Sequence, residues 1–158
     1  MTGHNSIKMV HSLLGKFLKP LGFLKKGGAW YLDSGESVLV FSPQKSNYGN
    51  KYYLNLGVYF FVLGELTCPS VRLCHIQARI ENIVPENLKL SVSDILDFDH
   101  IDMFDAKNIK IIRSALIDYA YPFMNSINTL NKAKIAEKEG VLSGLPVSRE
   151  LRELLDSQ

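Results

Sequence analysis

With 158 residues, 46% of them hydrophobic, the chain is long enough to bury the core of one globular domain. Its formal net charge of +2 is too small to indicate nucleic acid or a membrane surface as a partner. Its two cysteines provide neither a disulfide framework nor a zinc-site spacing, and no apolar run approaches the roughly eighteen residues of a membrane span. We therefore expect a reduced, cytoplasmic protein with no membrane partner, no metal and no cofactor.

The N-terminal region predicts one amphipathic helix, with Ser6 as its N-cap and its end marked by Pro20 and Gly22. The apolar residues of this segment share one face: Val10, Leu13, Leu14, Phe17, Leu18 and Leu21. Lysines between them also fit a cationic helix lying on a membrane. In a chain with so much strand pattern, the stripe favours packing on a sheet instead.

Three strand-like segments follow at residues 28–33, 37–46 and 51–61, joined by short turns. Because such turns are too short for crossover connections, these segments predict an antiparallel meander. Pro43 indicates a bulge or a sheet edge near the end of the second segment. A fourth, half-buried strand is predicted within residues 71–81.

The segment at 51–61 has two different faces, because alternate side chains of a strand point to opposite sides of the sheet. One face is typical of a core and consists of Tyr52, Leu54, Leu56, Val58 and Phe60. The other face is aromatic and amide-bearing, and consists of Tyr53, Asn55, Gly57, Tyr59 and Phe61.

The C-terminal half is mainly helical in pattern. Residues 81–105 predict an irregular connection with a short helix or strand. A helix is predicted from Asn108 to Leu130, with Asp105 as its cap and Pro122 kinking it or dividing it in two. A polar helix closed by Gly140 and a short final helix complete the chain.

These elements together predict a single α+β domain over residues 1–158, with its core in 13–130. The expected architecture is an antiparallel meander sheet of four to five strands, with an N-terminal helix and C-terminal helices packed on one face. Residues 141–158 begin with a link that contains glycine and proline, and we expect this segment to be loosely attached to the core.

The order of these elements resembles the bacterial family catalogued as "domain of unknown function 4304". The resemblance covers roughly residues 13–80 well and the C-terminal helices in outline. The phrases that carry it fall on Leu18, Gly22, Phe23 and Lys25; on Gln44, Lys45 and Ser46; on Asn55, Leu56 and Gly57; and on Cys74, His75 and Arg79. The resemblance implies a fold and no activity, and by analogy with small domains found near bacterial toxins it favours a binding role.

If the strands pair as a meander, the sheet face opposite the helices collects polar and aromatic side chains. We predict a binding surface there made of Tyr53, Asn55, Tyr59, His75, Gln77 and Arg79, joined by Gln44 and Trp30. Aromatic rings supply contact area, while amides and a guanidinium supply directional hydrogen bonds, and Gly57 would let another backbone approach closely. In the alternative interpretation, residues 81–105 fold over this face and bury it, and Arg79 pairs with one of their acids.

Other constellations indicate no catalysis. The acidic segment offers oxygen ligands at Asp97, Asp99 and Asp102 beside His100, but it fails the calcium-loop template, which needs glycine at the sixth position and glutamate at the twelfth. A solvated loop with helix caps explains it better. Cys74 and His75 are neighbours on a strand and point to opposite faces, so they cannot form a catalytic dyad, and we expect a buried cysteine and a surface histidine.

The leading functional hypothesis is a non-enzymatic, immunity- or adaptor-like module that binds a protein partner through the polar sheet face. The alternative is a small-ligand binder or an enzyme with a pocket on the same face, where His75 carries a proton and Arg79 holds an anion. Nucleic-acid binding is less favoured, because it needs five lysines to share one surface: Lys16, Lys19, Lys25, Lys26 and Lys45.

Overall fold

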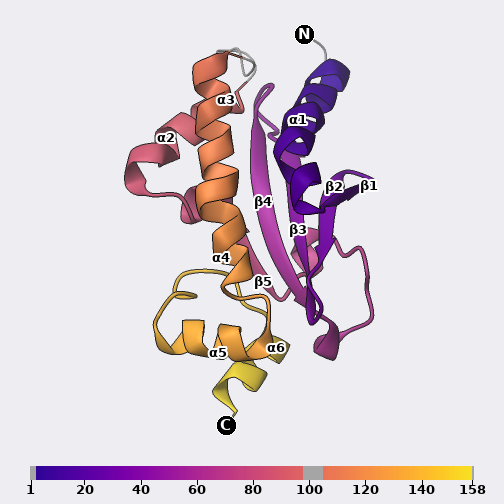
Figure 1. Ribbon diagram of the computed structural model, residues 1–158, viewed down its shortest axis with the longest axis vertical. Helices are drawn as coiled ribbons and strands as arrows, with labels where there is room; N and C mark the ends of the chain where they lie inside the picture. Colours follow the sequence, from indigo (N-terminus) through magenta and orange to yellow (C-terminus); the bar gives the residue numbers. More distant parts are fainter. Residues whose placement is uncertain (1–2, 98–104, 158) are drawn as a thin grey trace.

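The computed structural model describes residues 3–97 and 105–157, which form one antiparallel sheet with helices over one of its faces (Figure 1). The strands lie in the sheet in chain order and each pairs antiparallel with the next. They are β1 (Leu24–Lys26), β2 (Ala29–Asp33), β3 (Ser37–Lys45), β4 (Tyr52–Phe60) and β5 (Ile76–Arg79). The predicted α+β meander is therefore confirmed, and β1 is a short strand that the sequence pattern did not predict.

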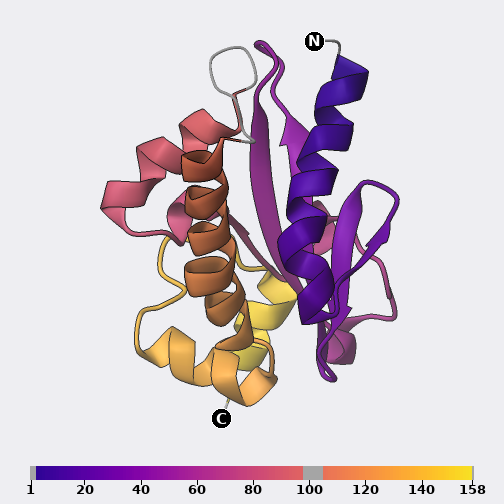
Figure 2. The ribbon, with the colours of Figure 1, turned by 45° about the horizontal axis from the view of Figure 1, so that its top comes forward.

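The helices form a second layer. They are α1 (Gly3–Leu18), α2 (Glu86–Ile95), α3 (Ala106–Arg113), α4 (Tyr121–Asn125), α5 (Leu130–Lys138) and α6 (Arg149–Asp156). Helix α1 and the α3–α4 run lie side by side over the sheet, α2 flanks α3, and α5 and α6 lie near the C-terminal end of the molecule (Figures 1 and 2). Within the described ranges, no helix has the length and apolarity to cross a bilayer.

Helix α1 packs its apolar stripe on the sheet, as predicted. Its buried residues are Val10, Leu13, Leu14 and Leu18. The predicted cap at Ser6 is wrong, because α1 begins at Gly3 and Ser6 lies inside it. Ser6 is instead buried, and its hydroxyl lies 2.9 Å from Asn50 Oδ1 and 3.0 Å from the Tyr52 hydroxyl.

The two faces of β4 enter two different clusters. The predicted core face is confirmed, since Tyr52, Leu54, Leu56, Val58 and Phe60 are all buried beneath the helices. A second, smaller cluster occupies part of the opposite face and consists of Ala29, Val38, Val40, Tyr59 and Cys74. Phe61 and Val71, from the segment after β4, pack against it. Residues 61–74 thus cover part of the face that the sequence suggested was open.

The long C-terminal helix is continuous in space but changes its winding. Asp105 caps α3 as predicted, accepting a hydrogen bond of 2.8 Å from the Lys107 N–H. Residues Ser114–Ala120 are π-helical, and Pro122 lies in the first turn of α4 directly after them. Proline has no N–H to donate and its ring crowds the preceding turn. The change from α- to π-helical winding just before Pro122 accommodates the proline, and the helix continues past it.

The described part of the C-terminal segment expected to be loosely attached, residues 141–157, packs apolar side chains into the core. Leu142, Leu151 and Leu155 are buried in the main cluster. Val147 bridges Ile76, which places the segment along the outer edge of β5. Sequence alone could not show this, because the contacts join positions about seventy residues apart.

Candidate functional site

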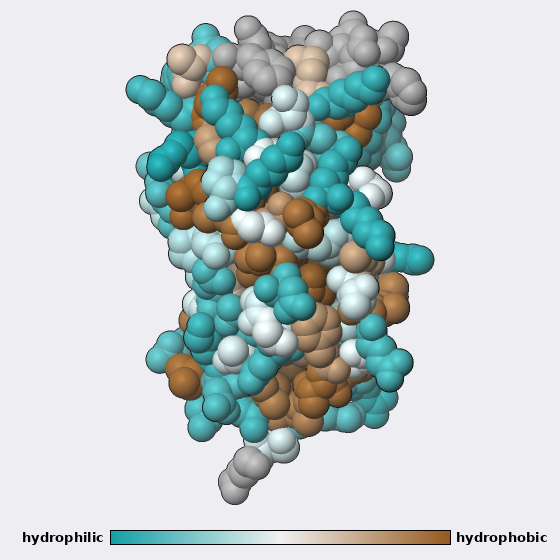
Figure 3. Space-filling model, turned by 45° about the vertical axis from the view of Figure 1, so that its right-hand side comes forward, coloured by the Kyte–Doolittle hydropathy of each residue, from teal (hydrophilic) through white to brown (hydrophobic). Residues whose placement is uncertain are grey.

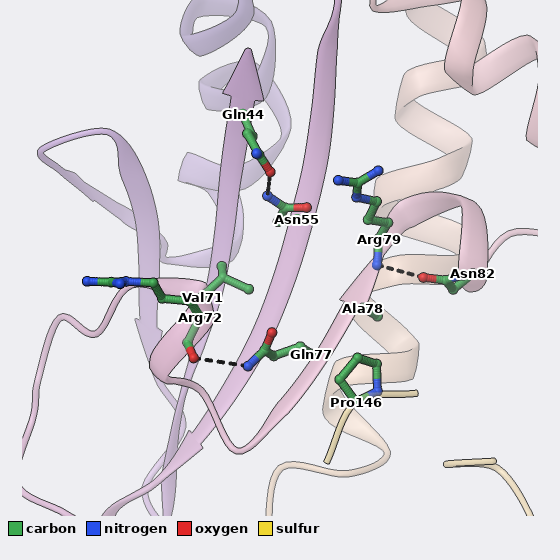
Figure 4. Close-up of a pocket in the computed structure, with 9 residues that line it drawn as sticks. All are labelled: Gln44, Asn55, Val71, Arg72, Gln77, Ala78, Arg79, Asn82 and Pro146. Atoms are coloured by element: carbon green, nitrogen blue, oxygen red, sulfur yellow. Dashed lines mark hydrogen bonds between the residues drawn. The ribbon is translucent and has the colours of Figure 1, made fainter. Parts of the chain in front are cut away.

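A hollow of about 400 Å³ lies on the sheet face opposite the helices, over β4 and β5. Its lining is rich in amide and guanidinium side chains and comes from five parts of the chain (Figure 4). The lining residues are Gln44, Asn55, Val71, Arg72, Gln77, Ala78, Arg79, Asn82 and Pro146. Four of the eight predicted site residues meet here: Gln44, Asn55, Gln77 and Arg79.

Arg79 is a charged residue of this lining whose side chain lies on the sheet beside the amides (Figure 4). It ends β5 directly opposite Asn55 of β4, and its side chain extends toward Asn55 (Figure 4). The guanidinium lies over the Tyr53 ring, 4.1 Å from its centroid. It is exposed and forms no ion pair with any carboxylate in the described parts of the chain. A guanidinium held over an aromatic ring, with no carboxylate paired to it, keeps N–H groups available to a ligand.

The amides around Arg79 are held by hydrogen bonds on the sheet surface. Asn55 Nδ2 donates to Gln44 Oε1 over 2.9 Å. Gln77 Nε2 donates to the main-chain oxygens of Arg72, at 3.1 Å, and Cys74, at 3.2 Å. Asn82 accepts a 2.8 Å hydrogen bond from the Arg79 N–H, which fixes the end of β5. These side chains are therefore ordered by the protein itself.

Tyr59 and His75 do not belong to the open surface, contrary to the prediction. Their exposed fractions are only 5% and 7%. Their rings lie in contact, tilted by 32° with centroids 4.5 Å apart, and His75 Nδ1 accepts a 2.9 Å hydrogen bond from the Phe60 N–H. Burial lowers the pKa of His75, while the nearby Glu150 charge acts weakly in the opposite direction. The expected surface histidine is thus a buried, neutral one with a structural role.

Trp30 lies on the opposite face of the sheet. It pairs with Phe41, which pairs with Leu56, and residues in one such row share a face. Its ring is buried under α1, and its Nε1 donates a 3.1 Å hydrogen bond to His11 Nδ1. The hairpin register, which was not known from the sequence, decides this placement.

Gly57 serves the chain's own packing. A side chain here would place its Cβ only 2.6 Å from Cys74 Sγ, so the glycine makes room for that thiol. Cys74 is buried as predicted, and burial raises its pKa to about 12. Cys74 does not share a face with Ile76, as strand alternation between the two residues would require. It lies in the smaller cluster, because it precedes β5 and the alternation begins only at Ile76.

The segment that partly covers the polar face is 61–74, whereas the predicted cover was 81–105. Within 81–97, Val84, Val92 and Leu96 are buried in the core on the helix side. The sequence also missed Arg72, Asn82 and Pro146 as lining residues. No periodic pattern marks them, because they lie in turns and reach the hollow only through the fold.

No group of three His, Cys, Asp or Glu side chains among the described residues could hold a metal ion. Asp99, His100 and Asp102 of the acidic segment lie outside the described residues. Both cysteines are free, Cys68 exposed and Cys74 buried.

The fold and the hollow define a small α+β domain with an open polar recess on its sheet. The family described as "Domain of unknown function (DUF4304)" matches residues 14–126, and the chain belongs to this family. Comparisons with curated proteins and with solved structures found no match.

Proposed function

We propose that this domain is a non-enzymatic binding module, immunity- or adaptor-like, which recognises a carboxylate of a protein partner in the hollow beside Arg79. One observation carries the proposal: the Arg79 guanidinium lies on Tyr53, at an amide-lined recess, with no described carboxylate as its partner. Guanidinium and carboxylate groups pair through two parallel hydrogen bonds, so such a side chain is suited to an acidic ligand. Two free cysteines fit the reducing cytoplasm of a bacterium, where we place the protein.

Because the recess is open, it favours binding of a protein partner over catalysis on a small substrate. An enzyme that uses His75 as proton carrier lacks support, because His75 does not line the hollow and is buried against Tyr59. A small anionic ligand could still meet Arg79, and it is the second outcome that the experiment must distinguish.

The experiment is capture of partners from a lysate of the source organism on three immobilised proteins. These are the wild type, Arg79→Glu and the control Arg113→Glu, which reverses an exposed charge on α3 far from the hollow lining. A protein held by wild type and Arg113→Glu should be retained at least about ten-fold less by Arg79→Glu, because a charge pair is replaced by repulsion.

The thermal midpoints of the three proteins should agree, since neither arginine forms an ion pair with a described residue. Equal capture by all three would contradict the proposal. Loss of capture by both variants would show that overall charge, and not the hollow, holds the partner. If no protein is captured but a small anion binds and Arg79→Glu abolishes that binding, the alternative of a small-ligand site takes its place.

A further inference from the structure

The orientation of the Gln77 side chain follows from its neighbours. Its amide end faces two main-chain carbonyl oxygens, those of Arg72 and Cys74, at 3.1 and 3.2 Å. Carbonyl oxygens only accept hydrogen bonds, so the group that faces them must be the NH₂ group. Both of its N–H donors are therefore occupied. The Oε1 atom points the other way, toward the hollow, and has no partner among the described residues (Figure 4).

Asn55 presents a second carbonyl oxygen to the same space. Its Nδ2 is occupied by Gln44 Oε1, and its Oδ1 is turned to the side of Arg79 (Figure 4). The hollow between β4 and β5 thus offers two hydrogen-bond acceptors beside the Arg79 guanidinium, whereas the Arg72 side chain extends away from them (Figure 4). A ligand that displaces water from both must supply N–H or O–H donors as well as an anion, because a buried, unpaired carbonyl oxygen is costly.

This combination disfavours simple anions. An acetate ion could pair with Arg79, but it carries no N–H or O–H group, so it would leave the Gln77 and Asn55 oxygens without a donor. A peptide has both required groups, because every residue except proline carries a main-chain N–H. The spacing also fits: Gln77 and Arg79 are two residues apart on β5, about 6.6 Å along the strand, which is the repeat of alternate residues in an extended chain.

We propose that the hollow binds an extended peptide segment of the partner, with an Asp or Glu side chain on Arg79 and a main-chain N–H donated to the amide oxygens of Gln77 and Asn55. This inference rests on the proposed function and names the chemistry of its partner. It adds a requirement for a hydrogen-bond donor to the requirement for a carboxylate, and the two can be tested separately.

The test is a titration of isotope-labelled protein followed by heteronuclear NMR, with four probes at millimolar concentrations. The probes are acetyl-Ala-Glu-Ala-amide, the same peptide with Gln in place of Glu, the Glu peptide methylated at its main-chain nitrogens, and acetate. The Glu peptide should shift the signals of β4 and β5. The methylated peptide should bind about five-fold more weakly, the typical effect of one net hydrogen bond, and acetate should shift these signals least.

The outcomes separate the two proposals. If the methylated peptide binds as well as the Glu peptide, or if acetate binds best, the donor requirement is wrong while carboxylate recognition stands. If the Gln peptide binds as well as the Glu peptide, the role of Arg79 in the proposed function is wrong. If no peptide shifts the signals of β4 or β5, the peptide inference is overturned. The proposed function is then still decided by the lysate experiment, which compares the proteins captured by wild type and by Arg79→Glu.

The variant Arg79→Gln sharpens the comparison. It should lose the preference for Glu over Gln and keep the effect of methylation, whereas the control Arg113→Gln should behave as the wild type. If Arg79→Gln also loses the effect of methylation, the two amide oxygens do not act as independent acceptors and the inference fails.

Discussion

Three side chains fasten residues 61–74 to the sheet. The Leu66 N–H lies 3.4 Å from the Tyr59 hydroxyl, Cys74 fills the space left by Gly57, and His75 Nδ1 accepts from the Phe60 N–H. His75 also accepts a main-chain hydrogen bond of 2.8 Å from Ser148. Because this fastened region carries lining residues of the hollow, these contacts shape the site although they lie beside it.

The buried His75 predicts a loss of stability in mild acid. Burial lowers its pKa below the ordinary value of 6.5, so the unfolded chain binds this proton more tightly than the folded one. Its stabilising contribution is therefore complete above about pH 6.5 and is lost as the pH falls through the lowered pKa. Urea unfolding at about pH 7.5 and about pH 5 should show this loss in the wild type.

The variant His75→Phe should be less stable at neutral pH, because the Phe60 N–H loses its acceptor, but it should depend less on pH. Comparing the two proteins is necessary because burial also lowers the pKa of His11, which contributes in the same direction. An equal pH dependence in both proteins would remove His75 as the cause.

Gly57→Ala should destabilise the protein by about 1–3 kcal/mol, the usual cost of overpacking a filled site. The new methyl group would lie 2.6 Å from Cys74 Sγ and 2.8 Å from its Cβ. The matched control is Gly28→Ala, where a Cβ would meet no atom within 4 Å. Chemical unfolding measures both, and equal stabilities of the two variants would show that Cys74 can move aside at no cost.

Among the elements, the last helix, α6, differs most from its prediction, because it was expected to be loosely attached and is part of the core. Its Leu151 and Leu155 are buried on the main core, and Ser148 caps it by accepting a 3.2 Å hydrogen bond from the Leu151 N–H. Arg152 of α6 also pairs with Glu137 of α5. Helix α6 is therefore held by a cap, by apolar burial and by a neighbouring helix.

Leu151→Ala should accordingly cost about 2–5 kcal/mol of unfolding free energy, the range for a large-to-small change in a core. The control Leu90→Ala makes the same chemical change on α2 at a side chain that is 80% exposed, and it should cost little. If Leu151→Ala is as mild as Leu90→Ala, the segment 141–158 is loosely attached after all.

Across the whole molecule, positive charge is concentrated in the part built from residues 3–32. Residues 3–32 contain five lysines and no acid. Lys19 Nζ lies 6.0 Å from the Trp30 ring centroid, and Lys25 pairs with Trp30 in the sheet, so α1 and β1 bring them together. Lys45 lies at the other end of β3, paired with Tyr52 near the start of α1. Hydrophilic side chains project from much of this side of the molecule, with apolar residues between them (Figure 3).

Lys25→Glu/Lys26→Glu should therefore elute from a heparin column at lower salt than Lys107→Glu/Lys110→Glu. Both double variants change the formal net charge from +2 to −2, because each Lys→Glu change removes two charges. Only the first pair lies in the concentrated region, and binding to a polyanion follows the local number of cations. Equal elution would mean that net charge alone governs the interaction, and it would remove the nucleic-acid hypothesis.

The sequence alone determined the type and order of most elements and the buried faces of α1 and β4. The stripe from Val10 to Leu18 and the alternation from Tyr52 to Phe60 are local patterns, and helix and strand geometry turns them directly into buried faces. The cap at Asp105 was equally local. Only the tertiary structure decided which part of the polar sheet face stays open. Strand register moved Trp30 to the other side, and residues 61–74 buried Tyr59 and His75. Those contacts join segments distant along the chain, so no pattern within a short stretch could encode where Gln77 and Arg79 would remain free.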